Sequence, residues 1–140
     1  MKTTLIAIAI GLLLAGTALA DDNDPQKLQG NWSVVSAEHH GRKVVEDELS
    51  RPKVIFKGNE MSYEENGKVR KGTFKVDDRT KPACINISPA DGAEAGQTFP
   101  GIYEIDGDTL KLCVREKGQG RPTTFKGGEG LLFVVMKRGK

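Results

Sequence analysis

The side chains of this 140-residue chain that could do chemistry belong to two histidines, two cysteines and two close pairs of aspartates. The histidines, His39 and His40, are adjacent, and imidazole could serve as a metal ligand or as a general base. Adjacent residues of a strand point to opposite faces, which separates the two rings, and no Cys, Asp or Glu stands at zinc-ligand spacing from them. Ser33 and Ser36 share the same short strand and complete no catalytic triad. We therefore predict no metal site and no catalytic residue.

Turn formation explains the paired aspartates. Asp106 and Asp108 flank Gly107, and the doublet 77–78 interrupts an alternating pattern. Asp favours turns because its carboxylate bonds to nearby backbone groups. The glycine-rich stretch 127–130 lacks the following helix that a phosphate-binding loop requires. The sequence thus predicts a protein that is not an enzyme and that needs no cofactor.

Cys84 and Cys113 are the only cysteines, and a cysteine pair in an exported protein is often bridged. Strand alternation places each of them beside a polar residue. If the strand around Tyr103 lies between them, their Cα atoms are about 9–10 Å apart, beyond the ~7 Å limit for a disulfide. This spacing favours free thiols, whereas a different strand order would allow a bridge.

Two-residue periodicity positions these residues on short strands. Asn66-Gly67 and Asp106-Gly107 each stand between alternating segments, which predicts two tight hairpins with positive φ at both central residues. A single helical turn is expected over Pro25–Leu28, and 44–49 is expected to be a short helix or a loop. The longest irregular stretch is 89–97. The predicted strands are 32–37, 53–57, 61–64, 69–76, 84–88, 98–105, 109–115, 123–126 and 131–136.

About eight to nine short strands with turns every 8–12 residues indicate a sandwich or a barrel. The sequential, hairpin-like connections favour a small antiparallel up-and-down β-barrel, because a closed barrel leaves no exposed edge. Residues 131–136 are apolar on both faces, which predicts that this last strand is covered on both sides.

The first 20 residues have the pattern of a signal peptide. Lys2 is followed by an apolar run over 5–14 and by Ala18-Leu19-Ala20, a small-x-small cleavage site. The run is shorter than the roughly 20 residues of a membrane-spanning helix. Thr17 stands where a lipoprotein would carry its lipidated cysteine. We therefore predict an exported protein, periplasmic or secreted, without a stable membrane anchor.

The predicted organisation is a signal peptide over 1–20, a flexible lead-in over 21–27 and one barrel domain over 28–138. The formal net charge is +2 at pH 7, with Lys and Glu interspersed along the chain. A nucleic-acid interface needs a basic face, so nucleic acid is not an expected partner.

Four segments of this sequence resemble an uncharacterised family of lipocalin-like exported domains of planctomycete bacteria. They are Leu28-Gln29-Gly30-Asn31-Trp32, the hairpin 101–113, Arg121-Pro122-Thr123-Thr124-Phe125 and the ending Lys137-Arg138. The resemblance covers about residues 26–138. It implies a lipocalin-like barrel in which Gly30 opens the first strand and Trp32 plugs the closed end. Unlike lipocalins proper, the chain has no Thr-Asp-Tyr segment and no long C-terminal helix.

The predicted function is that of a non-enzymatic binding module. Its ligand would be a small hydrophobic molecule in the barrel mouth, or another macromolecule at the loop 89–97, because function tends to lie on loops held by a rigid frame. The side chains expected to line the interior as ligand-binding residues are Trp32, Phe56, Tyr63, Phe74, Tyr103 and Phe133, with Phe125 also on a strand of its own.

An eight-stranded barrel has room for packed side chains or for one small ligand, and this many large residues favours a filled interior. The alternative function is a structural or protein-interaction domain of the cell envelope. It follows from the apolar last strand, whose outer residues would form an adhesive ridge if they were exposed. The sequence does not identify the ligand.

Overall fold

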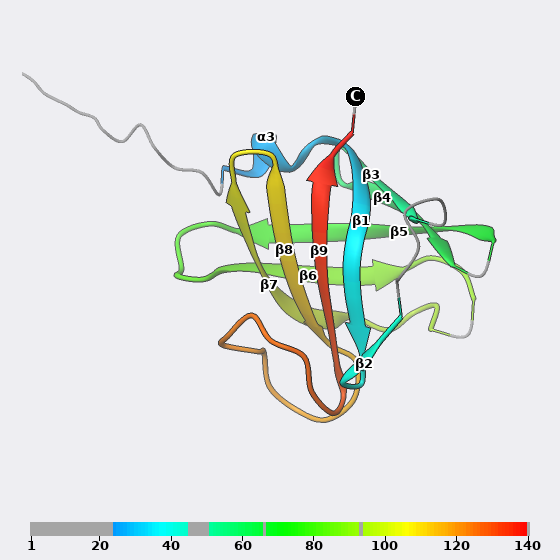
Figure 1. The fold of residues 1–140 in the computed structure, drawn as a ribbon, viewed down its shortest axis with the longest axis vertical. Helices are drawn as coiled ribbons and strands as arrows, with labels where there is room; N and C mark the ends of the chain where they lie inside the picture. The colour runs from blue at the N-terminus through cyan, green and yellow to red at the C-terminus, as the bar shows by residue number, and fades with distance from the viewer. Residues whose placement is uncertain (1–23, 45–50, 66, 93, 140) are drawn as a thin grey trace, which may run out of the picture.

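The computed structural model describes residues 24–44, 51–65, 67–92 and 94–139 (Figure 1). The predicted signal peptide over 1–20 lies outside the described residues, as do residues 21–23 of the lead-in 21–27 and most of the segment 44–49. In the part of the chain that is described, no helix has the length and apolar character needed to cross a membrane.

The described residues form one helical turn and nine strands. The turn is α3 (Pro25–Leu28), which confirms the prediction; Asp24 caps it by accepting a hydrogen bond from the Gln26 amide. The strands are β1 (Gly30–His39), β2 (Arg42–Lys43), β3 (Lys53–Lys57), β4 (Glu60–Glu65), β5 (Lys68–Asp77), β6 (Ala83–Pro89), β7 (Phe99–Asp106), β8 (Thr109–Arg115) and β9 (Leu131–Arg138).

The strands form one antiparallel sheet in the order β2-β1-β3-β4-β5-β6-β7-β8-β9, and β1 also pairs with β9. That last pairing closes β1 and β3–β9 into a barrel of eight strands, with β2 as an additional strand beside the end of β1 (Figure 1). Apart from β2, each strand pairs with the next one along the chain. The predicted all-β, up-and-down barrel is confirmed.

The hairpin between β7 and β8 differs in one detail from the prediction. Asp106 pairs with Thr109, so the two loop residues are Gly107 and Asp108, and only Gly107 has positive φ, at 60°. A positive φ at the first loop residue alone is typical of a type II′ turn, in which glycine occupies that position. The hairpin is therefore correct and the predicted turn type is wrong.

A β-bulge changes which residues of β1 face the barrel interior. Simple alternation places Ser36 on the same face as Trp32 and Val34. In the structure the register against β9 shifts between Val34 and Ser36, so that Ala37 is buried and Ser36 is not. One extra residue in a strand reverses the alternation beyond it, which sequence periodicity alone cannot show.

The predicted strand 123–126 is absent, because residues 116–130 form a segment without strand pairing. Glycines at both ends of the segment and Pro122, which has no amide N–H to donate, disfavour a sheet ladder. This segment is longer than the predicted 89–97 loop. Arg121 holds it to the barrel by donating from Nη1 to the carbonyl oxygens of Ile85 and Gly101, at 3.1 and 2.9 Å.

The segment 116–130 covers part of the outer face of the barrel. Ile102 and Cys113 are cross-strand neighbours on that face, yet they are 1% and 0% exposed. The Cys113 thiol lies 3.5 Å from the Lys126 carbonyl oxygen. On the next strand Phe133 pairs with Cys113 and is half-buried. The outer face of the last strand is thus only partly covered at this position, where the prediction was covering on both sides.

The two cysteines are free, and the strand order explains why. Cys84 pairs with Ile102, and Ile102 pairs with Cys113, so β7 runs between the two thiols as expected. One intervening strand separates their Cα atoms by about 9–10 Å, which is too far for a disulfide.

Candidate functional sites in and around the barrel

Trp32 and α3 close one end of the barrel, which we call the Trp32 end. The Trp32 side chain is fully buried, and its Nε1 donates a 2.9 Å hydrogen bond to the Leu28 carbonyl oxygen. The Arg138 guanidinium carbon lies 4.2 Å from the centre of the indole ring. Arg138 Nη1 and Nη2 donate hydrogen bonds to the carbonyl oxygens of Gln29 and Lys27, at 3.1 and 2.6 Å. This is the position that the family resemblance implies for Trp32.

Four of the six predicted ligand-binding side chains belong to the buried core: Trp32, Phe56, Phe74 and Tyr103. The rings of Phe56 and Phe74 meet edge to face, with centroids 5.0 Å apart. Leu110 and Met136 are buried with them, at 0% and 1% exposure. These side chains occupy the interior of the eight-stranded barrel, in agreement with the expectation of an interior filled by side chains.

The other two predicted residues lie elsewhere. Tyr63 is partly buried and packs against the core from β4. Phe133 does not line the interior: its neighbour Val134 faces the core, and alternation turns Phe133 to the outer face. Phe125 is on no strand, because it lies in the segment 116–130. The predicted interior position of Phe133 and the predicted strand position of Phe125 are therefore wrong.

The opposite end of the barrel, where β1 and β8 end and β9 begins, we call the far end. Four hydrophobic residues are partly buried and packed against the core, and three of them lie at the far end. They are Tyr63 in the second half of β4, Phe99 at the start of β7 and Leu132 at the start of β9. In an up-and-down barrel these strand halves meet at one end. The apolar interior is thus less completely buried at the far end than at the Trp32 end.

A surface pocket of about 180 Å³ lies between the outer faces of β5 and β6. Polar side chains line most of it, among them Lys75, Asn86 and a hydrogen-bonded pair, Ser88 and Thr98. Sites for drug-sized molecules usually measure about 300–1,000 Å³. This pocket is therefore too small to accommodate such a ligand.

His39, His40 and Glu116 come together at the rim of the far end. The two imidazole centroids are 4.1 Å apart, and His39 Nε2 lies 2.5 Å from Glu116 Oε1. One possible ligand atom from each of the three residues lies within 4.8 Å of the other two. The expectation that strand alternation separates the two rings is wrong, because His40 has a φ of 55° and leaves the strand.

Sequence reasoning did not find Glu116, which is 77 positions from His39. A signal was nevertheless present in the topology. In a closed up-and-down barrel the first strand and the strand before the last both flank the final strand, and they run in the same direction. The residues at their ends, His39 and Glu116, must then lie at the same rim. Barrel closure and register, rather than local spacing, reveal this pair.

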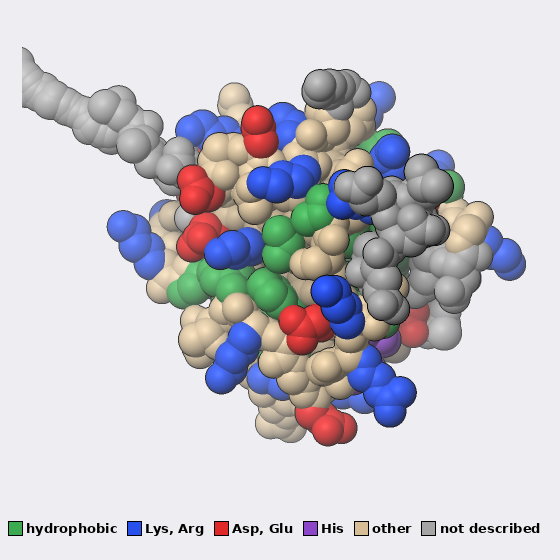
Figure 2. Space-filling model, viewed as in Figure 1, with side chains coloured by type: hydrophobic (Ala, Val, Ile, Leu, Met, Phe, Trp, Pro, Cys, Tyr) green, Lys and Arg blue, Asp and Glu red, His purple; other side chains and the backbone are tan. Residues whose placement is uncertain are grey.

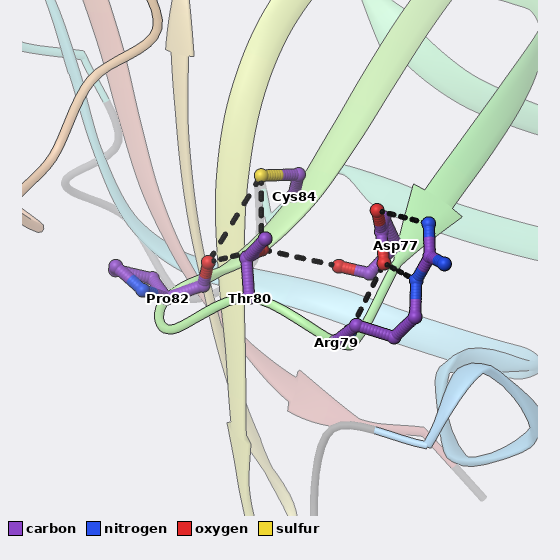
Figure 3. Close-up of polar contacts among 5 residues, drawn as sticks. All are labelled: Asp77, Arg79, Thr80, Pro82 and Cys84. Carbon is purple, nitrogen blue, oxygen red and sulfur yellow. Dashed lines mark hydrogen bonds and ion pairs between the residues drawn. The ribbon is translucent and has the colours of Figure 1, made fainter.

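The turn between β5 and β6 holds a second polar cluster (Figure 3). The Asp77 carboxylate accepts hydrogen bonds from Arg79 Nε, Nη2 and backbone N–H. These bonds lower the pKa of Asp77 from its usual 3.8 to about 2. In the same turn Thr80 Oγ1 lies 3.1 Å from the Cys84 thiol. The cluster is explained by its role in shaping the turn, as predicted for the aspartate doublet 77–78.

Comparisons of this chain with protein-family models, with curated proteins and with solved structures find no match.

Proposed function

We propose that this chain is an exported, non-enzymatic binding module of the lipocalin-like type, which takes a small hydrophobic ligand at the far end of the barrel. One observation carries the proposal. The Trp32 end is covered by α3 and Arg138, whereas Tyr63, Phe99 and Leu132 at the far end are only partly buried against the core. Ligand sites typically combine an apolar lining with a few polar groups, and barrel mouths are common places for them.

The expected ligand is small, because the buried aromatic side chains occupy the interior beyond the rim. An eight-stranded barrel holds at most one small ligand in addition to its own side chains. Tyr63 contributes an aromatic ring that is partly buried against the core, which suits contact with an apolar ligand. Export is part of the proposal because residues 1–20 have the signal-peptide pattern.

Hydrophobic-dye titration tests the site. We expect 1-anilinonaphthalene-8-sulfonate to fluoresce with the folded protein, and we expect Tyr63→Ala and Phe99→Ala to weaken its Kd about fivefold or more. That factor corresponds to ~1 kcal/mol, the order expected for burying about one CH₂ group. The matched control is Ile55→Ala, which removes an outward side chain on β3 that is 40% exposed. Equal effects in all three variants, or a folded protein without dye binding, would refute the proposal.

A second candidate, an interaction domain of the cell envelope, is favoured by the outer face of the last strands. Figure 2 shows hydrophobic side chains gathered on this face over β8 and β9, with charged side chains around them. The outward residues of β9 are Leu131, Phe133 and Val135, and each is half-buried. Concentration-dependent association in light scattering, lost on Val135→Lys, would support this candidate. A strict monomer would count against it.

A further inference from the structure

We propose that His39, His40 and Glu116 bind a divalent transition-metal ion of the zinc class at the rim of the far end. Imidazole nitrogens and a carboxylate oxygen are ligands that zinc prefers. Two histidines and one glutamate also form a recognised set of three protein ligands, which leaves a fourth position for water or another small ligand. The inference concerns an ion rather than an apolar molecule, so it goes beyond the function proposed above.

A shared backbone anchor at Gly130 positions Glu116 and His40. Gly130 O accepts hydrogen bonds from the amides of Glu116 and Lys117, at 2.8 and 3.1 Å. Gly130 N donates to His40 Nδ1 at 3.1 Å, and the His40 amide donates to the Leu131 carbonyl oxygen at 2.9 Å. Gly130 has a φ of 74°, and a Cβ there would overlap the Lys117 carbonyl oxygen. The anchor therefore requires glycine at position 130, and it fixes the backbone positions of Glu116 and His40.

The left-handed conformation of His40 brings its ring beside His39. A φ of 55° is uncommon for residues other than glycine, although histidine is enriched among the exceptions. Without this turn, the two rings would point to opposite faces of β1. Conformations of this kind tend to occur where a site needs a particular side-chain direction.

The distances need only a small adjustment to accommodate an ion. A tetrahedral zinc ion with bonds of about 2.0–2.2 Å holds its ligand atoms roughly 3.3–3.6 Å apart. The ligand atoms here lie within 4.8 Å of one another, and His39 Nε2 is 2.5 Å from Glu116 Oε1. The side chains of His39 and Glu116 are 45% and 30% exposed. Rotation about their side-chain bonds can therefore move the two ligand atoms apart by the roughly 1 Å that an ion needs. The ion would replace the proton that joins them.

Metal binding by His40 requires the loss of a hydrogen bond. Neutral imidazole has one nitrogen lone pair, and here Nδ1 uses it to accept the Gly130 N–H. His40 can bind an ion through either nitrogen only if that hydrogen bond breaks. Metal binding is therefore expected to change the environment of the Gly130 amide, which is remote in sequence from both histidines.

The ligand set also predicts selectivity among ions. Imidazole suits zinc, copper and nickel, whereas magnesium and calcium prefer sites made of oxygen ligands alone. We therefore expect binding of Zn²⁺ and no binding of Mg²⁺ at the same concentration.

Calorimetric titration of the untagged protein with zinc chloride tests the site. The expected result is one Zn²⁺ per chain. His39→Ala, His40→Asn and Glu116→Gln should each weaken the Kd by at least about tenfold, since even the loss of an outer partner of a metal ligand costs that much. Asn is chosen at His40 because it tolerates positive φ. The matched control is Glu104→Gln, an exposed residue of β7 with the same change of charge, which should bind like the parent.

Nuclear magnetic resonance of the parent protein tests the site without variants, whose folding could fail. The chain has two histidines, both in this site, so every histidine ring signal reports on it. Zinc should shift both sets of ring signals and the Gly130 amide in the parent protein. Absence of stoichiometric binding, or an unchanged Kd in any of the three variants, would overturn the site. Dye binding at Tyr63 and Phe99 is measured separately, so failure of one proposal is distinguishable from failure of the other.

Discussion

Asp77 shows how one neighbouring residue sets the ionisation of an exposed carboxylate. Arg79 donates to it from two side-chain nitrogens and from the backbone, at 2.9, 3.1 and 3.0 Å. Hydrogen bonds to the charged form of a carboxyl group lower its pKa. The charged Asp77 is thus favoured in the folded protein, and protonation weakens the contact with Arg79.

We predict that the ¹³C signal of the Asp77 carboxyl titrates with a pKa of about 2 and that Arg79→Ala raises this pKa toward 3.8. Because the folded-state pKa is the lower one, the contact stabilises the fold above pH 4, and this stabilisation disappears as the pH falls through about 2. A normal Asp77 pKa in the parent protein would contradict the assignment.

The two thiols should differ in reactivity. Cys113 is 0% exposed, and burial raises the pKa of its thiol, so little of the reactive thiolate forms at neutral pH. Cys84 is only half-buried, at the start of β6 beside the turn shown in Figure 3. Iodoacetamide labelling followed by mass spectrometry should modify Cys84 in the native protein and Cys113 only after denaturation. Native labelling of Cys113 at the denatured rate would show that the segment 116–130 does not cover it.

Among the elements, α3 and the two strand ends beside it form the closed end of the barrel. Trp32 joins them, since its ring packs in the core, its Nε1 bonds to α3 and its face contacts Arg138. We predict that Trp32→Ala lowers the free energy of unfolding by roughly 3–5 kcal/mol, the usual cost of removing a large buried aromatic side chain. Urea denaturation monitored by circular dichroism measures it.

Val69→Ala provides the control for Trp32→Ala, because Val69 is 61% exposed and its removal leaves no cavity. Its effect should stay within about 0.5 kcal/mol, as for other surface substitutions. If Trp32→Ala unfolded at the same urea concentration as the parent, the closed end would contribute little to stability.

Most elements could be predicted from periodicity and turn residues. Lys53–Lys57 and Thr109–Arg115 have the bounds that the alternating pattern indicates, because each strand is bounded by residues that favour turns. The exceptions depend on tertiary structure. The bulge at Val34 and Ser36 arises from pairing with β9, and the covering of Cys113 arises from a segment that has no pattern of its own.

The candidate sites were less predictable than the strands. Aromatic residues on alternating faces correctly indicated the core positions of Phe56 and Phe74. The grouping of His39, His40 and Glu116 depends on a left-handed residue and on two strands flanking β9, so no local spacing could show it.

At the scale of the whole molecule, the first and last strands of the barrel pair with each other. β1 and β9 are joined by contacts between residues about a hundred positions apart, such as Trp32 and Arg138. A barrel of this kind is completed only when the end of the chain is in place, and contacts between distant residues slow folding. The two ends of the described domain lie at the same end of the barrel, with α3 over the β7–β8 hairpin and the C-terminus beyond β9 (Figure 1).

This proximity predicts that a circular permutant will fold. The Gly139 amide donates to the Asn31 carbonyl oxygen at 2.7 Å, and Arg138 reaches the Lys27 carbonyl oxygen. A linker of about eight Gly and Ser residues, with an r.m.s. span of ~16 Å, is long enough to join the end of β9 to the start of α3. New termini between Gly96 and Gln97 fall in an exposed loop, where a cut would break the turn bond from the Gln97 amide to the Glu94 carbonyl oxygen.

We expect this permutant to give the circular dichroism spectrum of the parent and one cooperative unfolding transition, because every strand pair of the barrel is retained. Its free energy of unfolding should differ by about 1 kcal/mol, the scale of a change in loop closure. The matched control places the new termini between Lys111 and Leu112, which divides β8 in the middle of its pairing with β7 and β9, and this chain should not fold. If both permutants fold equally well, or neither does, closure of the barrel by β1 and β9 does not govern the stability of this domain.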